Sequence, residues 1–262
     1  MKKIAFLLAV TLIATSCSKK DDSNEPQNVP VHFLFTQNWD GDPIENADYE
    51  TTDYINEHGE TLKLSKLVYL ISDITFRNAS GEVFDAGDYN LIDARESTNI
   101  HFVPNIEIPT GTYNVSFTFG FDNEDNAGNY PDLNSADGGW NVPLIMGGGY
   151  HYMRMEGKYT SPSTGTDVTN FQYHAIRAND NTVDPLLLTD TSFVVDLGEI
   201  TITDDLEIEI KMNVAEWFKN PNTWDLNLLH EMLMPNYDAQ IMMSGNGANG
   251  VFSLGSVGPH VD

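Results

Sequence analysis

Residues Tyr113–Phe121 read YNVSFTFGF, in which apolar and small or polar side chains alternate at every position. A period of two places the aromatic and branched side chains on one face of an extended strand and the polar ones on the other. Comparable stretches at Val31–Phe35, Leu62–Phe76, Tyr150–Tyr159, Asn170–Ile176, Ser192–Ile202 and Leu206–Val214 are rich in residues that favour strands. Leu62–Phe76 fits one long strand or two short ones, and the last two stretches read as a pair joined by Thr203–Asp205.

Glycine, asparagine and proline clusters separate these stretches, for example at Asn78–Gly81 and Pro109–Gly111. Many short strands punctuated in this way are typical of a β-sandwich. We therefore predict a mainly β fold, an antiparallel two-sheet sandwich, with short helices near the C-terminus at Val214–Phe218 and Pro235–Met243. Because there is no internal repeat and no second linker, one domain is expected.

The N-terminus has the pattern of an export signal. Lys2 and Lys3 precede an apolar run, Ile4–Ala14, which is too short to span a bilayer as a helix and ends in small residues before Cys17. Residues 1–17 are therefore expected to be a lipoprotein signal peptide, with Cys17 carrying the lipid that anchors the protein to a membrane. The alternative is an ordinary signal whose cleavage site contains a cysteine.

Residues 18–29 begin SKKDDSNEP, a polar and charged stretch expected to be a disordered acidic tether before a domain at 30–262. A lysine followed by two acidic residues resembles the signal that takes Bacteroidetes lipoproteins to the outer face of the outer membrane. The protein is thus expected to be exported and held at the outer membrane, exposed at the cell surface. A generic solvated linker is the alternative.

Charge excludes one class of partner. The chain has 39 acidic and 13 basic residues, and loss of Lys2 and Lys3 with the signal leaves 11 basic residues. Such a surface repels nucleic acid phosphates and attracts cations, so no nucleic-acid binding is expected.

A cluster of soft metal ligands is the first candidate site. If Tyr150–Tyr159 is a strand, His151, Met153 and Met155 share one face, and His174 lies in the following stretch. Imidazole and thioether together suit copper, particularly Cu(I), better than calcium or magnesium. The alternative is that the methionines pack the core and a buried histidine binds a backbone carbonyl.

An oxygen-rich loop is the second candidate, for calcium. It contains Asp122, Asp125, Asp132 and Asp137, but Ala127 and Leu133 occupy the positions where an EF-hand needs glycine and an acidic residue. A solvated, turn-rich loop is the better interpretation. Further soft ligands could come from the C-terminal methionines Met232, Met234, Met242 and Met243.

No catalytic constellation is present in the sequence. It contains no G-x-S-x-G motif, no phosphate loop and, once Cys17 is acylated, no nucleophilic cysteine. The protein is therefore expected not to be an enzyme.

Four segments, in order, resemble the copper-binding MbnP-like family, whose Bacteroidetes members are lipoproteins. They are LSKLVYLISDITF from Leu64, DLNSADGG from Asp132 with MGGGYHYMRMEGKY from Met146, FQYHAIR from Phe171, and EIEIKMNVAEWF from Glu207 continuing to GVFSLGS at Gly250. The resemblance implies that residues 30–262 form an MbnP-like domain that handles copper, with histidine ligands matching His151 and His174. It also implies a partner, a di-haem peroxidase-like protein.

The chain departs from methylotroph relatives at two places. Ser135 stands where their LNHAD-like motif has a histidine, and Asn141–Gly148 lacks the tryptophan that those relatives oxidise to kynurenine. Trp140 is close in sequence but not at the aligned position, and it is expected to pack over a loop.

A different function remains open on the sequence alone. The sandwich could be a surface recognition or adhesion module that binds a glycan or a protein without metal. Trp39, Trp140 and Trp224 would then be exposed and line its recognition face.

Overall fold

The computed structural model describes residues 26–87, 89–161 and 168–260. The expected signal peptide with Cys17, and the expected tether up to residue 25, lie outside the described residues. The folded part begins before residue 30, because β1 (Asn28–Val29) pairs with β9 (Ile108–Pro109). The end of the expected tether is thus part of the domain.

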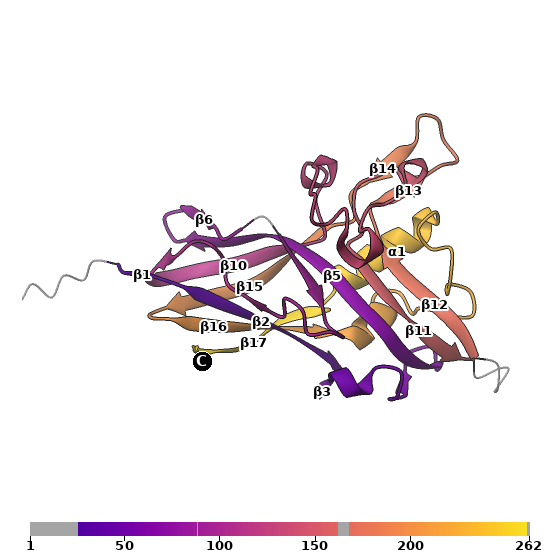
Figure 1. Ribbon diagram of the computed structural model, residues 1–262, viewed down its shortest axis with the longest axis horizontal. Coiled ribbons are helices and arrows are strands. Elements are labelled where there is room, and N and C mark those ends of the chain that lie inside the picture. The colour runs from indigo at the N-terminus through magenta and orange to yellow at the C-terminus, as the bar shows by residue number, and fades with distance from the viewer. Residues whose placement is uncertain (1–25, 88, 162–167, 261–262) are drawn as a thin grey trace, which may run out of the picture.

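A long strand, β5 (Thr61–Asn78), organises the larger sheet and runs through the middle of Figure 1. The sheet has eight strands, in the order β12-β11-β5-β10-β15, with β4, β6 and β7 also paired to β5. Their bounds are β4 Tyr54–Ile55, β6 Val83–Asp85, β7 Tyr89–Asp93, β10 Gly111–Phe119, β11 Met153–Thr160, β12 Val168–Ala175 and β15 Phe193–Ile202. Of the two readings of Leu62–Phe76, the single long strand is the one observed.

The second sheet has five strands, in the order β17-β16-β2-β3, with β8 paired to β2. They are β2 Val31–Trp39, β3 Asp42–Pro43, β8 His101–Phe102, β16 Leu206–Asn213 and β17 Phe252–Pro259. The predicted pairing of Ser192–Ile202 with Leu206–Val214 is wrong. β15 joins the larger sheet beside β10, whereas β16 pairs parallel with β2. Each strand buries one face, so the turn between them carries the chain from one sheet to the other.

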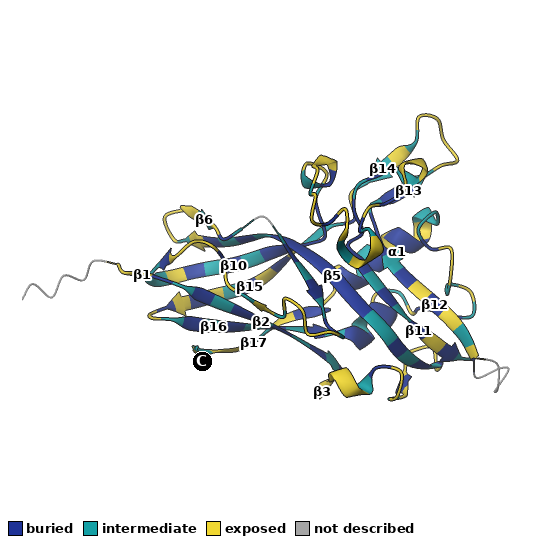
Figure 2. Ribbon diagram, viewed as in Figure 1, coloured by how far each residue is buried: buried dark blue, intermediate teal, exposed yellow. Residues whose placement is uncertain are grey.

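The core lies between the inner faces of the two sheets, and Figure 2 shows buried positions alternating along their strands. Aromatic rings fill much of it. Phe119 of β10 lies 5.1 Å from the ring of Trp217, and Phe117 meets Phe252 edge-on at 5.4 Å. The mainly β, two-sheet prediction is confirmed by these layers. The strand pairs of the described residues are antiparallel as predicted, except for the parallel pair of β2 and β16.

Helices and loops gather at the end of the sandwich where β11 and β12 lie (Figure 1). Helix α1 (Tyr237–Ala248) starts two residues later than predicted, because the Asn236 side chain caps the backbone N–H of Ala239 at 3.1 Å. Val214–Phe218 forms one short 3-10 helix, η5. The remaining elements are η1 Asn46–Asp48, η2 Asp125–Ala127, η3 Ala136–Gly138, η4 Leu144–Met146, β13 Ala178–Asp180 and β14 Leu187–Thr189. Within the described residues, no helix has the length and apolar character to cross a membrane.

Candidate metal centre

His151 lies just before β11, where a glycine turn brings the chain back to the sheet. Gly147, Gly148 and Gly149 all have positive φ, at 93°, 66° and 84°, and a side chain on Gly149 would collide with Asn126. The backbone N–H of His151 then donates to the carbonyl oxygen of Trp140 at 3.0 Å instead of to a strand neighbour. The side chain is 3 % exposed, so this turn buries an imidazole at the end of the sheet.

The ring of His151 lies between a carbonyl and a thioether. Nδ1 is 2.9 Å from the carbonyl oxygen of Trp140, and Nε2 is 3.1 Å from Sδ of Met234. Nδ1 also lies 3.2 Å from a nitrogen of Arg154, which only donates, whereas the Trp140 carbonyl oxygen is closer and only accepts. We assign the hydrogen to Nδ1 on the shorter contact, in which Nδ1 donates to the carbonyl oxygen. Nε2 then presents its lone pair to the sulfur, and two soft donor atoms face each other at a separation that one metal ion can bridge.

Met234 is held in this position by two buried amides. The Asn179 side chain donates to the Met234 carbonyl oxygen at 2.9 Å, and the Gln240 side chain donates to the carbonyl oxygens of Leu233 and His174 at 3.0 and 2.9 Å. The segment before α1 is therefore tied to the end of β12.

His174 belongs to the same cluster. Its ring stands edge-on to that of His151, with centroids 5.6 Å apart. Nε2 is 2.8 Å from Oε1 of Glu156, and because a carboxylate only accepts, Nε2 carries the hydrogen. Nδ1 is then the nitrogen of this ring that could bind a metal. A carboxylate that orients the far nitrogen of a histidine is the usual support of a metal-binding imidazole.

Two pKa shifts in this cluster favour metal binding, one at His151 and one at Glu156. Burial, with a further contribution from Arg154, lowers the pKa of His151 to about 3, so the imidazole is neutral at pH 7. The hydrogen bond from His174 lowers the pKa of Glu156, which keeps that carboxylate ionised.

Arg154 closes the site from the loop side. Its guanidinium donates to the carbonyl oxygens of Asp137 and Gly139 at 2.9 and 2.6 Å and stacks 4.7 Å from the ring of Trp140. Trp140 is fully buried, with its ring centroid 5.6 Å from that of His151. The loop before Trp140 is thus fastened over the histidine.

The predicted common face of His151, Met153 and Met155 is wrong. In the antiparallel ladder Arg154 lies opposite His174, whereas Met155 lies opposite Tyr173, so the two methionines point to the other side of the sheet from His174. Both are fully buried in the core. The strand starts at Met153, and the irregular residues before it break the alternation on which the prediction relied.

Three of the four carboxylates of the predicted calcium loop have separate partners. Asp122 accepts from the backbone N–H groups of Glu124 and Asp125, Asp132 accepts from the Tyr89 hydroxyl, and Asp137 pairs with Lys66 and Arg154. Within the described residues no three of them come together as a metal cluster.

The sequence analysis noted Met234 only as one of four C-terminal methionines, and it missed Glu156 and Arg154 as supports. The sequence did contain a pattern that points to Arg154 and Glu156. They alternate with the two core methionines along β11, which places both on the face opposite the methionines. Met234 had no such signal, since it is brought in from 83 residues away.

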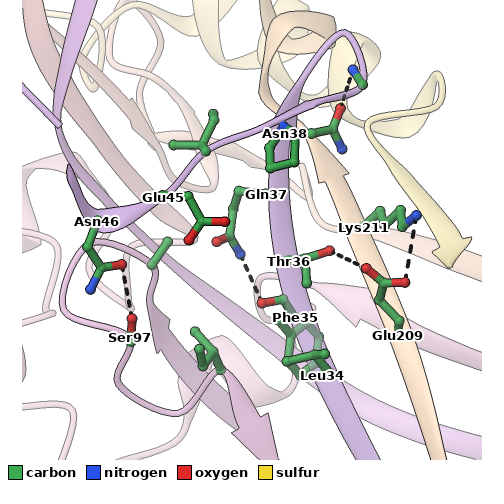
Figure 3. Close-up of a pocket in the computed structure, with 15 residues that line it drawn as sticks. Leu34, Phe35, Thr36, Gln37, Asn38, Glu45, Asn46, Ser97, Glu209 and Lys211 are labelled. Carbon is green, nitrogen blue, oxygen red and sulfur yellow. Dashed lines mark hydrogen bonds and ion pairs between the residues drawn. The ribbon is translucent and has the colours of Figure 1, made fainter. Parts of the chain in front are cut away.

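A pocket of about 380 Å³ lies elsewhere, between β2, β16 and the loops around Glu45 and Ser97. Figure 3 shows Gln37, which donates to the Phe35 carbonyl oxygen, and the contacts of Glu209 with Thr36 and Lys211 among the residues that line it. None of its lining residues belongs to the histidine cluster.

The predicted tryptophan recognition face does not form. Trp39 is 7 % exposed, and Trp140 and Trp224 are fully buried. All three pack in the interior, and this removes the feature on which the adhesion-module reading depended.

A family model described as MbnP matches residues 28–242. Among solved structures, MbnP from Methylosinus trichosporium is 15 % identical, with 88 % of this chain and 99 % of that chain covered and a TM-score of 0.47. No curated protein matches.

Proposed function

The chain belongs to the MbnP family, and on that premise we propose that it binds a copper ion through His151, His174 and Met234. The observation that carries the proposal is the 3.1 Å approach of His151 Nε2 to the sulfur of Met234. A neutral imidazole nitrogen and a thioether sulfur form a donor set that favours copper, above all Cu(I), over hard cations.

The surroundings support the same assignment. The Trp140 carbonyl favours a hydrogen on Nδ1 of His151, and Glu156 favours one on Nε2 of His174, so the other nitrogen of each ring would bind the ion. Arg154 is not a ligand in this proposal; its guanidinium holds the loop before Trp140 over the site. The acidic surface of the protein would raise the local concentration of cations.

The remaining features of the proposal concern place and partner. We take the protein to be exported, anchored at the outer membrane through lipid on Cys17, and exposed at the cell surface, where it would acquire or hand on copper without catalysing a reaction. A di-haem peroxidase-like protein is the partner that the family resemblance suggests.

The test is a Cu(I) titration of the domain from residue 26, against a chromophoric chelator of known affinity. We expect one tightly bound Cu(I) per wild-type chain, and loss of that ion in His151→Ala and in His174→Ala. Met155→Leu is the matched control, because it changes a thioether on the other side of the sheet. Equal copper binding by wild type and both histidine variants would contradict the proposal.

A further inference from the structure

A second cluster of ligating side chains lies where the β4–β5 turn meets the loop after Trp224. Nδ1 of His58 is 2.7 Å from Oε1 of Glu60 and 3.6 Å from Oδ1 of Asp225. One ligand atom from each of the three residues lies within 4.8 Å of the other two. None of them belongs to the His151 site.

Glu60 is the unusual member, because its carboxylate is completely buried. The side chain is 0 % exposed, and Oε2 has no hydrogen-bond partner among the described residues. No Lys or Arg in the described part of the chain forms an ion pair with Glu60 or Asp225; His58 is the cationic partner recorded for both. Buried carboxylates are normally paired with a cation or bound to a metal, and here one partly exposed histidine faces two carboxylates, one of them fully buried. The cluster therefore has more negative than positive charge.

A fourth side chain, that of Asn227, holds the two carboxylates of the cluster together. Nδ2 of Asn227 donates to Oε1 of Glu60 at 2.6 Å and to Oδ1 of Asp225 at 2.8 Å. The backbone N–H of Glu60 is fixed in turn by Asn56, whose side chain also donates to the Trp224 carbonyl oxygen. Both carboxylates are therefore preorganised, and a preorganised set of ligands loses little entropy on binding an ion.

The site is open to solvent on one side. The His58 side chain is 41 % exposed and that of Asp225 is 26 % exposed, whereas Glu60 forms the closed floor. An ion can therefore enter past His58 and keep a water molecule on the open side.

We propose that His58, Glu60 and Asp225 bind a zinc ion. One imidazole and two carboxylates match the three protein ligands, plus water, of an open tetrahedral zinc site, and two carboxylate charges balance one divalent cation. These three ligands include no sulfur, which Cu(I) prefers. They also do not suit calcium, which takes six to eight oxygen ligands, because one of the three is an imidazole nitrogen. The ion would clamp the β4–β5 turn to the loop that follows Trp224, segments about 165 residues apart in sequence.

The experiment is zinc binding by the chelator-treated domain in a His151→Ala background, which removes the proposed copper site. Calorimetry with Zn²⁺ alone is expected to give one ion per chain, and zinc is expected to raise the midpoint of thermal unfolding. Both effects should be lost in His58→Ala and in Asp225→Asn, whose side chains are partly exposed and tolerate change. Asn227→Ala should weaken zinc binding about 10-fold, as loss of an outer support does elsewhere.

Glu57→Gln is the matched control, because it removes one exposed carboxylate next to His58 without touching the cluster. It should bind zinc like the background protein. If the His58 and Asp225 variants, folded by circular dichroism, bind zinc as well as this control does, the site does not exist. The same holds if the background protein binds no zinc. Either result leaves the copper proposal untouched, since the two sites share no residue.

Discussion

Acid should destabilise the metal-free domain through His151, and the size of the effect follows from its burial. Burial and the nearby Arg154 lower the pKa of this imidazole to about 3 in the folded protein. In the unfolded chain a histidine has its ordinary pKa of about 6.5. Below that value the unfolded chain takes up a proton that the folded chain refuses, so stability is fully present above pH 6.5 and falls as the pH is lowered towards 3.

The magnitude is set by the gap between the two pKa values. Each pH unit between them costs about 1.4 kcal/mol of unfolding free energy, so acidification from pH 7.5 to pH 4.5 should remove about 3 kcal/mol through this one group. That is a large share of the stability of an ordinary domain.

The assay is urea-induced unfolding of wild type and His151→Gln at several pH values from 4.5 to 7.5, without copper. The carboxylates titrate in both proteins. The difference between the two plots of unfolding free energy against pH therefore isolates the contribution of His151. The wild type should lose about 3 kcal/mol more than the variant over this range. His101→Gln, in which the replaced side chain is 65 % exposed, should follow the wild type. Parallel curves for wild type and His151→Gln would refute the reasoning.

Three further substitutions test other parts of the structure. Gly120→Ala would put a side chain into the ring of Tyr152 at a position with φ of 80°, and urea unfolding should show a loss of about 2 kcal/mol or more. Glu156→Gln removes the charged partner of His174 Nε2, and chelator competition should show copper affinity about 10-fold weaker with the fold intact. Met155→Leu keeps the volume of a core side chain, so it should cost less than about 1.5 kcal/mol in unfolding free energy and leave copper affinity unchanged.

Much of the fold could be predicted from alternation. Tyr113–Phe121 was placed within two residues of β10, because one face of that strand is buried and the other is polar. Alternation shows which side of a strand is buried, but not which strand lies beside it. The predicted pairing of β15 with β16 was wrong for that reason. β16 pairs instead with β2, from the other end of the chain.

The site was predictable only in part, for a related reason. His151 and His174 were chosen correctly as neighbours, with ring centroids 5.6 Å apart. The prediction that Met153 shares a face with His151 was wrong, because regular alternation begins only at Met153. The glycine turn and the hydrogen bond from the His151 N–H to the Trp140 carbonyl oxygen take residues 150–152 out of the regular ladder. Met234 comes from a loop whose position depends on Asn179 and Gln240, which no local pattern reveals.

The ligand set itself is the central claim, and X-ray absorption at the copper edge tests it most directly. Wild-type protein loaded with one Cu(I) should show nitrogen scatterers together with one sulfur scatterer, and the sulfur should disappear in Met234→Leu but remain in Met155→Leu. A spectrum with only nitrogen and oxygen neighbours would contradict the account, as would a sulfur that survives the loss of Met234.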